Sequence, residues 1–170
     1  MCIRDRGRGA AKRLKSYGGK FKIHGGEFVT LSNRIQYLGG IFCTNGSTRP
    51  AVESRVQMTQ AVHERLTPKI YRSKIYPLHQ KVEAYKVFEL TALLSGLDVR
   101  TLGHGDMDIL ERWQMRKLRH LSNSPAHITH ETNHALRKRL GVYTITSTLR
   151  LRRLLFFEMC YCIPKQMNNS

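Results

Sequence analysis

The chain has 170 residues, enough for one domain with a hydrophobic core, and no stretch approaches the ~18 apolar residues that a membrane span needs. Its 29 Lys and Arg residues outnumber 12 Asp and Glu, which gives a formal net charge of +17 and favours a polyanionic partner. Among polyanions we favour nucleic acid over an anionic membrane surface, because the basic residues are spread over several predicted helices, and we expect no membrane partner.

The N-terminal segment, residues 1–19, is basic, poor in acids and without an apolar core. We expect a disordered arm there; the abrupt change of character before Phe21 is also what a truncated or misassembled, non-native reading frame produces. The cysteines lack the paired spacing of a zinc ribbon or a disulfide framework, which indicates an intracellular compartment, nuclear or cytoplasmic. They are Cys2, Cys43, Cys160 and Cys162.

Residues 20–44 have the pattern of a β-hairpin region. Phe21 and Ile23 alternate with lysines, Gly25-Gly26 predicts a tight turn, and a β-branched and aromatic run continues to Phe42. We expect two or three short antiparallel strands.

Helical patterns dominate from Asn45-Gly46 onward. The first predicted helix has Ser47 or Thr48 as N-cap and Pro50 in its first turn, and Pro68 is expected to break the chain after about Leu66. Spacings of three and four predict a buried stripe of Val52, Val56, Thr59, Val62 and Leu66, with Arg49, Arg55 and His63 off it.

Four further helices are expected. The second starts near Pro77 and stops at Gly96, and its inner side carries Leu78, Val82, Tyr85, Phe88 or Glu89, and the run Ala92 to Leu94. In the third, Asp106 is the predicted N-cap and Leu110, Trp113, Leu118 and Leu121 face inward. The fourth is predicted from a Thr129 cap through Leu140 to Gly141, and the fifth from a Thr146 or Ser147 cap to about Met159, with 164–170 as a flexible tail.

The stretch IQYLGGIFCTNGSTRPAVESRV, residues 35–56, resembles part of the reverse transcriptases of non-LTR (LINE-class) retrotransposons. In that family a Tyr-Leu-Gly hairpin leads through a polar turn into the first thumb helix. KVEAYKVFELTALLSGLDVRTL resembles its second thumb helix, DILERWQMRKLRHLSN the next helix, and LRLRRLLFFEMC a later basic and aromatic helix. The matches cover about residues 35–160 in the family order, which makes them more specific than any single motif.

The resemblance implies a mainly α fold, with a short N-terminal antiparallel β-hairpin region followed by about five helices in a thumb-like bundle. Residues 20–44 would end the palm, 45–100 would be the thumb and 101–163 a basic post-thumb region. The primer-grip element, which presents backbone to a nucleic-acid strand, would be Tyr37, Leu38, Gly39 and Gly40. Glycine suits this role because a side chain would block close approach.

The family's Tyr-x-Asp-Asp motif would lie before Phe21, and this sequence does not contain it. Because that motif holds the carboxylates that bind two Mg²⁺ ions in the full polymerase, we expect no catalytic residue, no cofactor and no polymerisation from this chain alone. The missing palm and fingers would be a partner.

Binding of RNA, DNA or their hybrid is expected through phosphate contacts that leave sequence largely unread. The thumb-like candidates are Arg55, Lys69, Arg72, Lys74, Lys81 and Lys86. The post-thumb candidates are Arg112, Arg116, Lys117, Arg119, Arg150, Arg152 and Arg153, with Arg137, Lys138 and Arg139 in the same basic group.

Other chemistry is weakly indicated. Asp106 and Asp108 are better explained by an acidic helix start than by a magnesium site. His127, His130 and His134 would share a face on a continuous helix, but a solvated polar face is favoured over zinc. Cys160 and Cys162 suit helix-end thiols, and Trp113 suits the core better than base stacking. Two alternatives stay open: a stand-alone basic RNA-binding protein and an inactive structural remnant.

Overall fold

The computed structural model describes residues 20–22, 28–30, 32–37 and 40–166, and the predicted arm 1–19 lies outside this range. The chain forms two compact units, Met1–Gly46 and Ser47–Ser170, and each is considered by itself. As predicted, the fold is mainly α, with antiparallel hairpin structure at the N-terminal end and helices thereafter.

The first unit contains two separate antiparallel hairpins. β1 (Lys20–Lys22) pairs with β2 (Phe28–Thr30), and β3 (Arg34–Tyr37) pairs with β4 (Gly40–Cys43). The described part therefore has four short strands rather than two or three. Thr44 N donates to Asn33 O (3.1 Å), which closes the second hairpin at its open end.

The second unit begins with α2 (Arg49–Leu66), which has the predicted bounds. The predicted break at Pro68 is wrong, because the chain continues from α2 into a π-helix, η1 (Thr67–Tyr71). The wider π turn accommodates the proline ring, and Thr67 Oγ1 donates to His63 O (2.7 Å) at the junction. His63 was predicted to lie off the buried stripe, but it is buried, since the partners described below satisfy its ring.

The second predicted helix is a rod of three pieces. They are α3 (Leu78–Ala84), η2 (Tyr85–Leu90) and α4 (Thr91–Leu94), and Gly96 ends the rod with φ +71°. Its inner face differs from the prediction at Leu78, which is exposed, and of the two alternatives Phe88 and Glu89 it is Glu89 that is buried.

The third predicted helix is α5 (His104–Leu121), and its four predicted apolar residues are buried. Its N-cap is Gly103, so the prediction of Asp106 as cap is wrong. Asp106 lies inside the first turn instead, where Thr48 Oγ1 donates to it and Arg49 forms an ion pair with it (3.4 Å). The carboxylate thus joins the starts of α2 and α5, a long-range role that capping rules do not predict.

The predicted fourth helix, Thr129 to Leu140, is interrupted near its start: a short helix, α6 (Ala126–Thr129), ends at the predicted cap, and α7 (Asn133–Leu140) forms the remainder. His130 interrupts it with φ +50°, and the cap of α7 is Thr132, whose hydroxyl accepts from Ala135 N (3.2 Å), rather than Thr129. Gly141 ends α7 as predicted, with φ +59°.

The last helix, α8 (Ile145–Gln166), begins earlier and ends later than predicted. The hydroxyl of Thr144, not of Thr146 or Ser147, accepts from Ser147 N (3.1 Å) at its start. The helix continues beyond Met159 and through part of the expected tail to Gln166.

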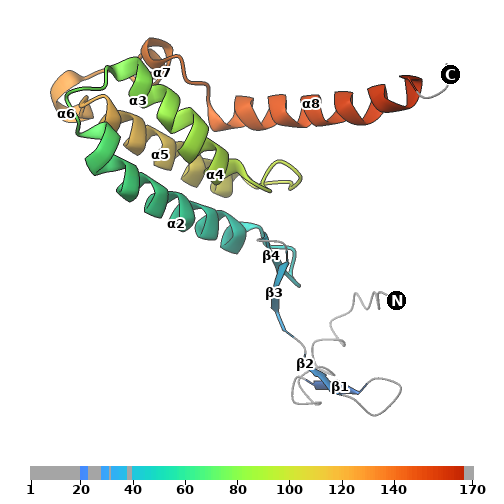
Figure 1. The fold of residues 1–170 in the computed structure, drawn as a ribbon. Coiled ribbons are helices and arrows are strands. Elements are labelled where there is room, and N and C mark those ends of the chain that lie inside the picture. Colours follow the sequence, from blue (N-terminus) through green and yellow to red (C-terminus); the bar gives the residue numbers. More distant parts are fainter. Residues whose placement is uncertain (1–19, 23–27, 31, 38–39, 167–170) are drawn as a thin grey trace. The chain divides into compact units, whose positions relative to one another are not determined.

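One buried cluster joins the helices of the second unit, from Val52 in α2 to Leu149 in α8. The expected thumb-like region 45–100 and post-thumb region 101–163 both contribute to this core. Figure 1 shows α2, α5 and the α3–α4 rod side by side, with α8 leading away from them. Among the described residues, no helix has the length and apolar character needed to cross a membrane.

Candidate nucleic-acid interface

The predicted phosphate contacts divide into cations that are held internally and cations that are not. Internal partners engage Lys81 (Tyr71 O, 2.9 Å), Lys86 (Glu83, 2.8 Å), Arg112 (Asp108 O, 3.1 Å), Arg119 (Glu131 O, 2.8 Å) and Arg153 (Asp98 O, 2.8 Å). Arg55 is half-buried. Within the described part of the chain, no hydrogen bond or ion pair holds the side chains of Lys69, Arg72, Lys74, Arg116, Arg150 or Arg152.

Lys117 differs most from its predicted place on the basic side of α5. Only 6% of it is exposed, because Trp113 lies 5.4 Å from the ammonium and Gln60 accepts a hydrogen bond from it. Burial lowers the pKa of Lys117, and the nearby Glu89 charge opposes this effect. The lysine is therefore a positioned charge rather than a freely solvated one.

A pocket of about 520 Å³ lies where α2 and η1 meet α5. Three cationic side chains line it, Arg72, Arg116 and Lys117, together with His63, His120 and the single carboxylate Glu64. We call this the α2/α5 pocket. Gln60, Thr67 and Pro68 complete its lining. Its excess of positive charge and its concave form suit an anionic group such as phosphate.

A chain of buried polar groups leads from the core to this pocket. Glu89 is fully buried and its Oε1 lies 2.8 Å from His63 Nδ1, while His63 Nε2 lies 3.2 Å from His120 Nδ1. His63 is 5% exposed, whereas His120 is exposed at the pocket. Tyr71 packs against His63 with ring centroids 5.3 Å apart, and burial, reinforced by Glu89, raises the pKa of its hydroxyl.

His120 has a lowered pKa. Burial is the main cause, followed by the neighbouring His63, Lys117 and Arg72, while Glu89 acts in the opposite sense. The crowding of positive groups around this ring means that an incoming anion would be stabilised by charges already in place.

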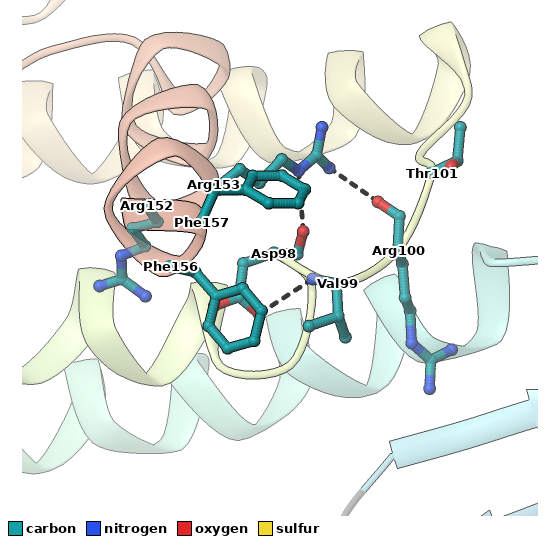
Figure 2. Close-up of a pocket in the computed structure, with 8 residues that line it drawn as sticks. All are labelled: Asp98, Val99, Arg100, Thr101, Arg152, Arg153, Phe156 and Phe157. Carbon is teal, nitrogen blue, oxygen red and sulfur yellow. Dashed lines mark hydrogen bonds between the residues drawn. The ribbon is translucent and has the colours of Figure 1, made fainter. Parts of the chain in front are cut away.

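A second pocket, of about 380 Å³, lies between residues 98–101 and α8 (Figure 2). Arg153 donates from Nε to Asp98 O (2.8 Å) and from its NH2 group to Arg100 O (2.7 Å), and so fastens this loop to the helix. Phe156 and Phe157 line the same pocket and are more than half exposed. Exposed aromatic rings beside arginine are the arrangement that stacks unpaired bases.

The primer-grip prediction is only partly covered by the structure. Tyr37 ends β3 and pairs with Gly40, the first residue of β4. Tyr37 is 64% exposed. Leu38 and Gly39 lie outside the described residues, so their role in a primer grip stays a prediction.

The three histidines considered for zinc do not share a helical face. His127 lies in α6, His130 has a left-handed backbone, and His134 lies in α7. In the described part of the chain, no three His, Cys, Asp or Glu side chains are grouped so that they could hold a metal ion. The two aspartates considered for magnesium also lie in different surroundings, since Asp106 is buried and Asp108 is exposed.

Sequence reasoning gave no functional role to His63, Glu89, His120 or Gln60, although Glu89 was one of the two residues considered for the inner face of the second helix. A signal existed for two of them, since His63 follows Thr59 by four residues and Glu89 follows Tyr85 by four, each continuing a buried row. A polar residue in such a row is ordinarily assigned to the solvated side, because burial without a partner is costly, and the partners here are distant in sequence. Comparison of the chain with protein-family models, curated proteins and solved structures found no match.

Proposed function

We propose that this chain binds nucleic acid through phosphate contacts centred on the α2/α5 pocket, as a thumb-like fragment of a retrotransposon RNA-directed DNA polymerase. The observation that carries the binding proposal is the pair Arg72 and Arg116, whose guanidinium groups have no internal partner in the described residues and line the same concave site. Buried Lys117 adds a fixed third charge beside them.

Phosphate is the ligand that this arrangement favours. Guanidinium groups donate paired hydrogen bonds that match phosphate oxygens, and they read no base sequence. Other exposed cations without internal partners in the described residues, among them Lys69, Lys74 and Arg150, add positive charge outside the pocket. A formal charge of +17 supports a large counterion-release contribution to binding.

The assignment to a polymerase rests on the sequence resemblance. In the full enzyme, Mg²⁺ would be held by carboxylates that this sequence lacks, so the chain would supply grip on an RNA–DNA hybrid or template RNA and no chemistry. Purified chain given primed template, Mg²⁺ and nucleotides is expected to extend no primer.

Salt titration of binding tests the proposal. Affinity for an RNA–DNA hybrid, measured by fluorescence anisotropy, is expected to fall steeply with salt, and Arg116→Gln or Arg72→Gln should each lower the slope of log K against log salt by about 0.9. Arg65→Gln is the matched control, because it removes one charge from an exposed position on α2 that does not line the α2/α5 pocket and is not among the predicted phosphate contacts, and it should leave the slope nearly unchanged.

Each other result points to a different function. Equal slopes for Arg116→Gln and Arg65→Gln would reject the pocket as the centre of binding. Equal affinity for hybrid, duplex RNA and single-stranded DNA would favour a stand-alone basic RNA-binding protein over the thumb-like fragment. No binding even at low salt would favour the inactive remnant.

A further inference from the structure

We infer that the α2/α5 pocket is a phosphodiester subsite in which His120 gains a proton as the phosphate enters. This deepens the proposed function and rests on it, since the phosphate is that of a nucleic-acid backbone. It adds a property that a generic basic surface lacks: coupling of one bound phosphate to one proton.

The hydrogen-bond chain determines which nitrogen gains the proton. Glu89 Oε1 lies 2.8 Å from His63 Nδ1, and because a carboxylate oxygen accepts, this nitrogen carries the hydrogen and donates it. We assign the tautomer in which His63 Nε2 accepts, so the hydrogen between the two rings (3.2 Å) belongs to His120 Nδ1. His120 Nε2 is left without a hydrogen and is the atom that accepts the proton.

The groups around His120 explain why this proton is absent before the anion binds. Three cations lie near His120: Arg72, which follows η1, and Arg116 and Lys117 on α5. The His63 ring on α2 is its hydrogen-bond partner, and the nearby acids are Glu64 on α2 and Glu89 on η2. Burial and the positive neighbours hold the pKa of His120 below its ordinary value. At neutral pH the ring is therefore mostly neutral.

An entering phosphodiester reverses this balance. Its negative charge offsets Arg72 and Lys117 and makes an imidazolium at His120 favourable, with Nε2–H directed to a phosphate oxygen and Nδ1–H still donated to His63. The buried Glu89 carboxylate stabilises the new charge through His63. No other atom changes its bonding, and the proton comes from solvent.

The sign of the pH dependence follows from this linkage. Because the bound state has the higher His120 pKa, the extra affinity is fully present below the free-state pKa and is lost as pH rises through the bound-state pKa. Between the two values the affinity should change by about tenfold per pH unit for one proton. Backbone phosphodiesters do not titrate in this range, so the dependence belongs to the protein.

Two probes test the inference with the full chain. The first is the affinity for a short RNA–DNA hybrid between about pH 5 and about pH 8, the range in which histidines titrate. The second is dimethyl phosphate, a phosphodiester that keeps its single charge throughout, followed by NMR titration of the His120 ring. We expect hybrid affinity to rise as pH falls and dimethyl phosphate to raise the His120 pKa.

His120→Asn is the informative variant, because the amide can still donate to His63 but cannot gain a proton. It should keep the salt slope and lose the tenfold-per-unit pH dependence, whereas His134→Asn, an exposed histidine on α7, should behave as the parent chain. Retention of the full pH dependence in His120→Asn would overturn the inference, as would an unchanged His120 pKa with dimethyl phosphate.

The outcomes separate this inference from the proposed function. Hybrid binding with no pH dependence would overturn the proton coupling and leave nucleic-acid binding intact. A raised His120 pKa with dimethyl phosphate but no hybrid binding would support the phosphate subsite and overturn the proposed function. Circular dichroism of the two asparagine variants establishes that they fold, since both histidines are exposed.

Discussion

Glu89 is a fully buried carboxylate whose hydrogen-bond partner, His63, comes from a different helix. Periodicity left the choice between Phe88 and Glu89 open at this position, and Phe88 is 52% exposed in the structure. The Glu89 carboxylate can occupy the inner position because His63 forms a hydrogen bond with it. Without that histidine, a phenylalanine would be the better core residue.

Removal of the Glu89 carboxylate should be costly. Glu89→Ala is expected to lower the free energy of unfolding by about 3 kcal/mol, because it leaves His63 buried without its partner and opens a cavity. Urea denaturation gives the measurement. Glu83→Ala is the control from the same rod, where the ion pair with Lys86 is exposed, and about 0.5 kcal/mol or less is expected. Similar losses in the two variants would show that the His63–Glu89 pair does not stabilise the core.

At the scale of elements, α5 organises the second unit. Its polar residues make long-range bonds to other parts of the unit: Asp106 to the start of α2, Gln114 to Tyr143 O (3.0 Å), and Glu111 to Arg137 and to the first turn of α8. These bonds explain why capping and charge rules misassign α5 residues, since those rules consider a helix by itself.

The attachment of α8 to residues 98–101 depends on Arg153. Arg153→Ala removes two charge-assisted hydrogen bonds and should lower the free energy of unfolding by about 1 to 2 kcal/mol. It should also speed amide hydrogen exchange in residues 98–101. Arg152 lines the same pocket without an internal partner in the described residues, so Arg152→Ala should change neither quantity appreciably. Exchange that is equally slow in both variants would mean that other contacts hold the loop.

At the scale of the whole molecule, all the residues of the buried core that the structure describes lie in the unit Ser47–Ser170. A chain of residues 47–170 should therefore unfold in one transition with nearly the midpoint of the full chain, as measured by urea denaturation. A chain ending at Ser124 should lose that cooperative transition, because it lacks the buried Leu136, Leu140, Ile145 and Leu149. A markedly lower midpoint for 47–170 would show that residues 1–46 stabilise the helical unit.

Local patterns predicted much of the fold and little of the site. The bounds of α2, the inner face of α5 and the glycine stops at Gly96 and Gly141 follow from spacing and backbone preference, which act within a few residues. Pro68 and Thr129 were assigned wrongly because a π turn and a left-handed His130 compete with the usual rules. The sequence also indicated Arg72 and Arg116 as phosphate contacts, but it did not distinguish them from the other basic residues.

The sequence by itself determined the helical class, the order of the helices and the excess of positive charge, since each depends on composition or short-range periodicity. Tertiary structure decided which cations are held internally, that Lys117 is buried, and that Glu89, His63 and His120 form one chain. His63 and His120 are 57 residues apart, and they meet because α2 and α5 bury their apolar sides against a shared core. Such pairings follow from the packing of whole helices, which no local pattern contains.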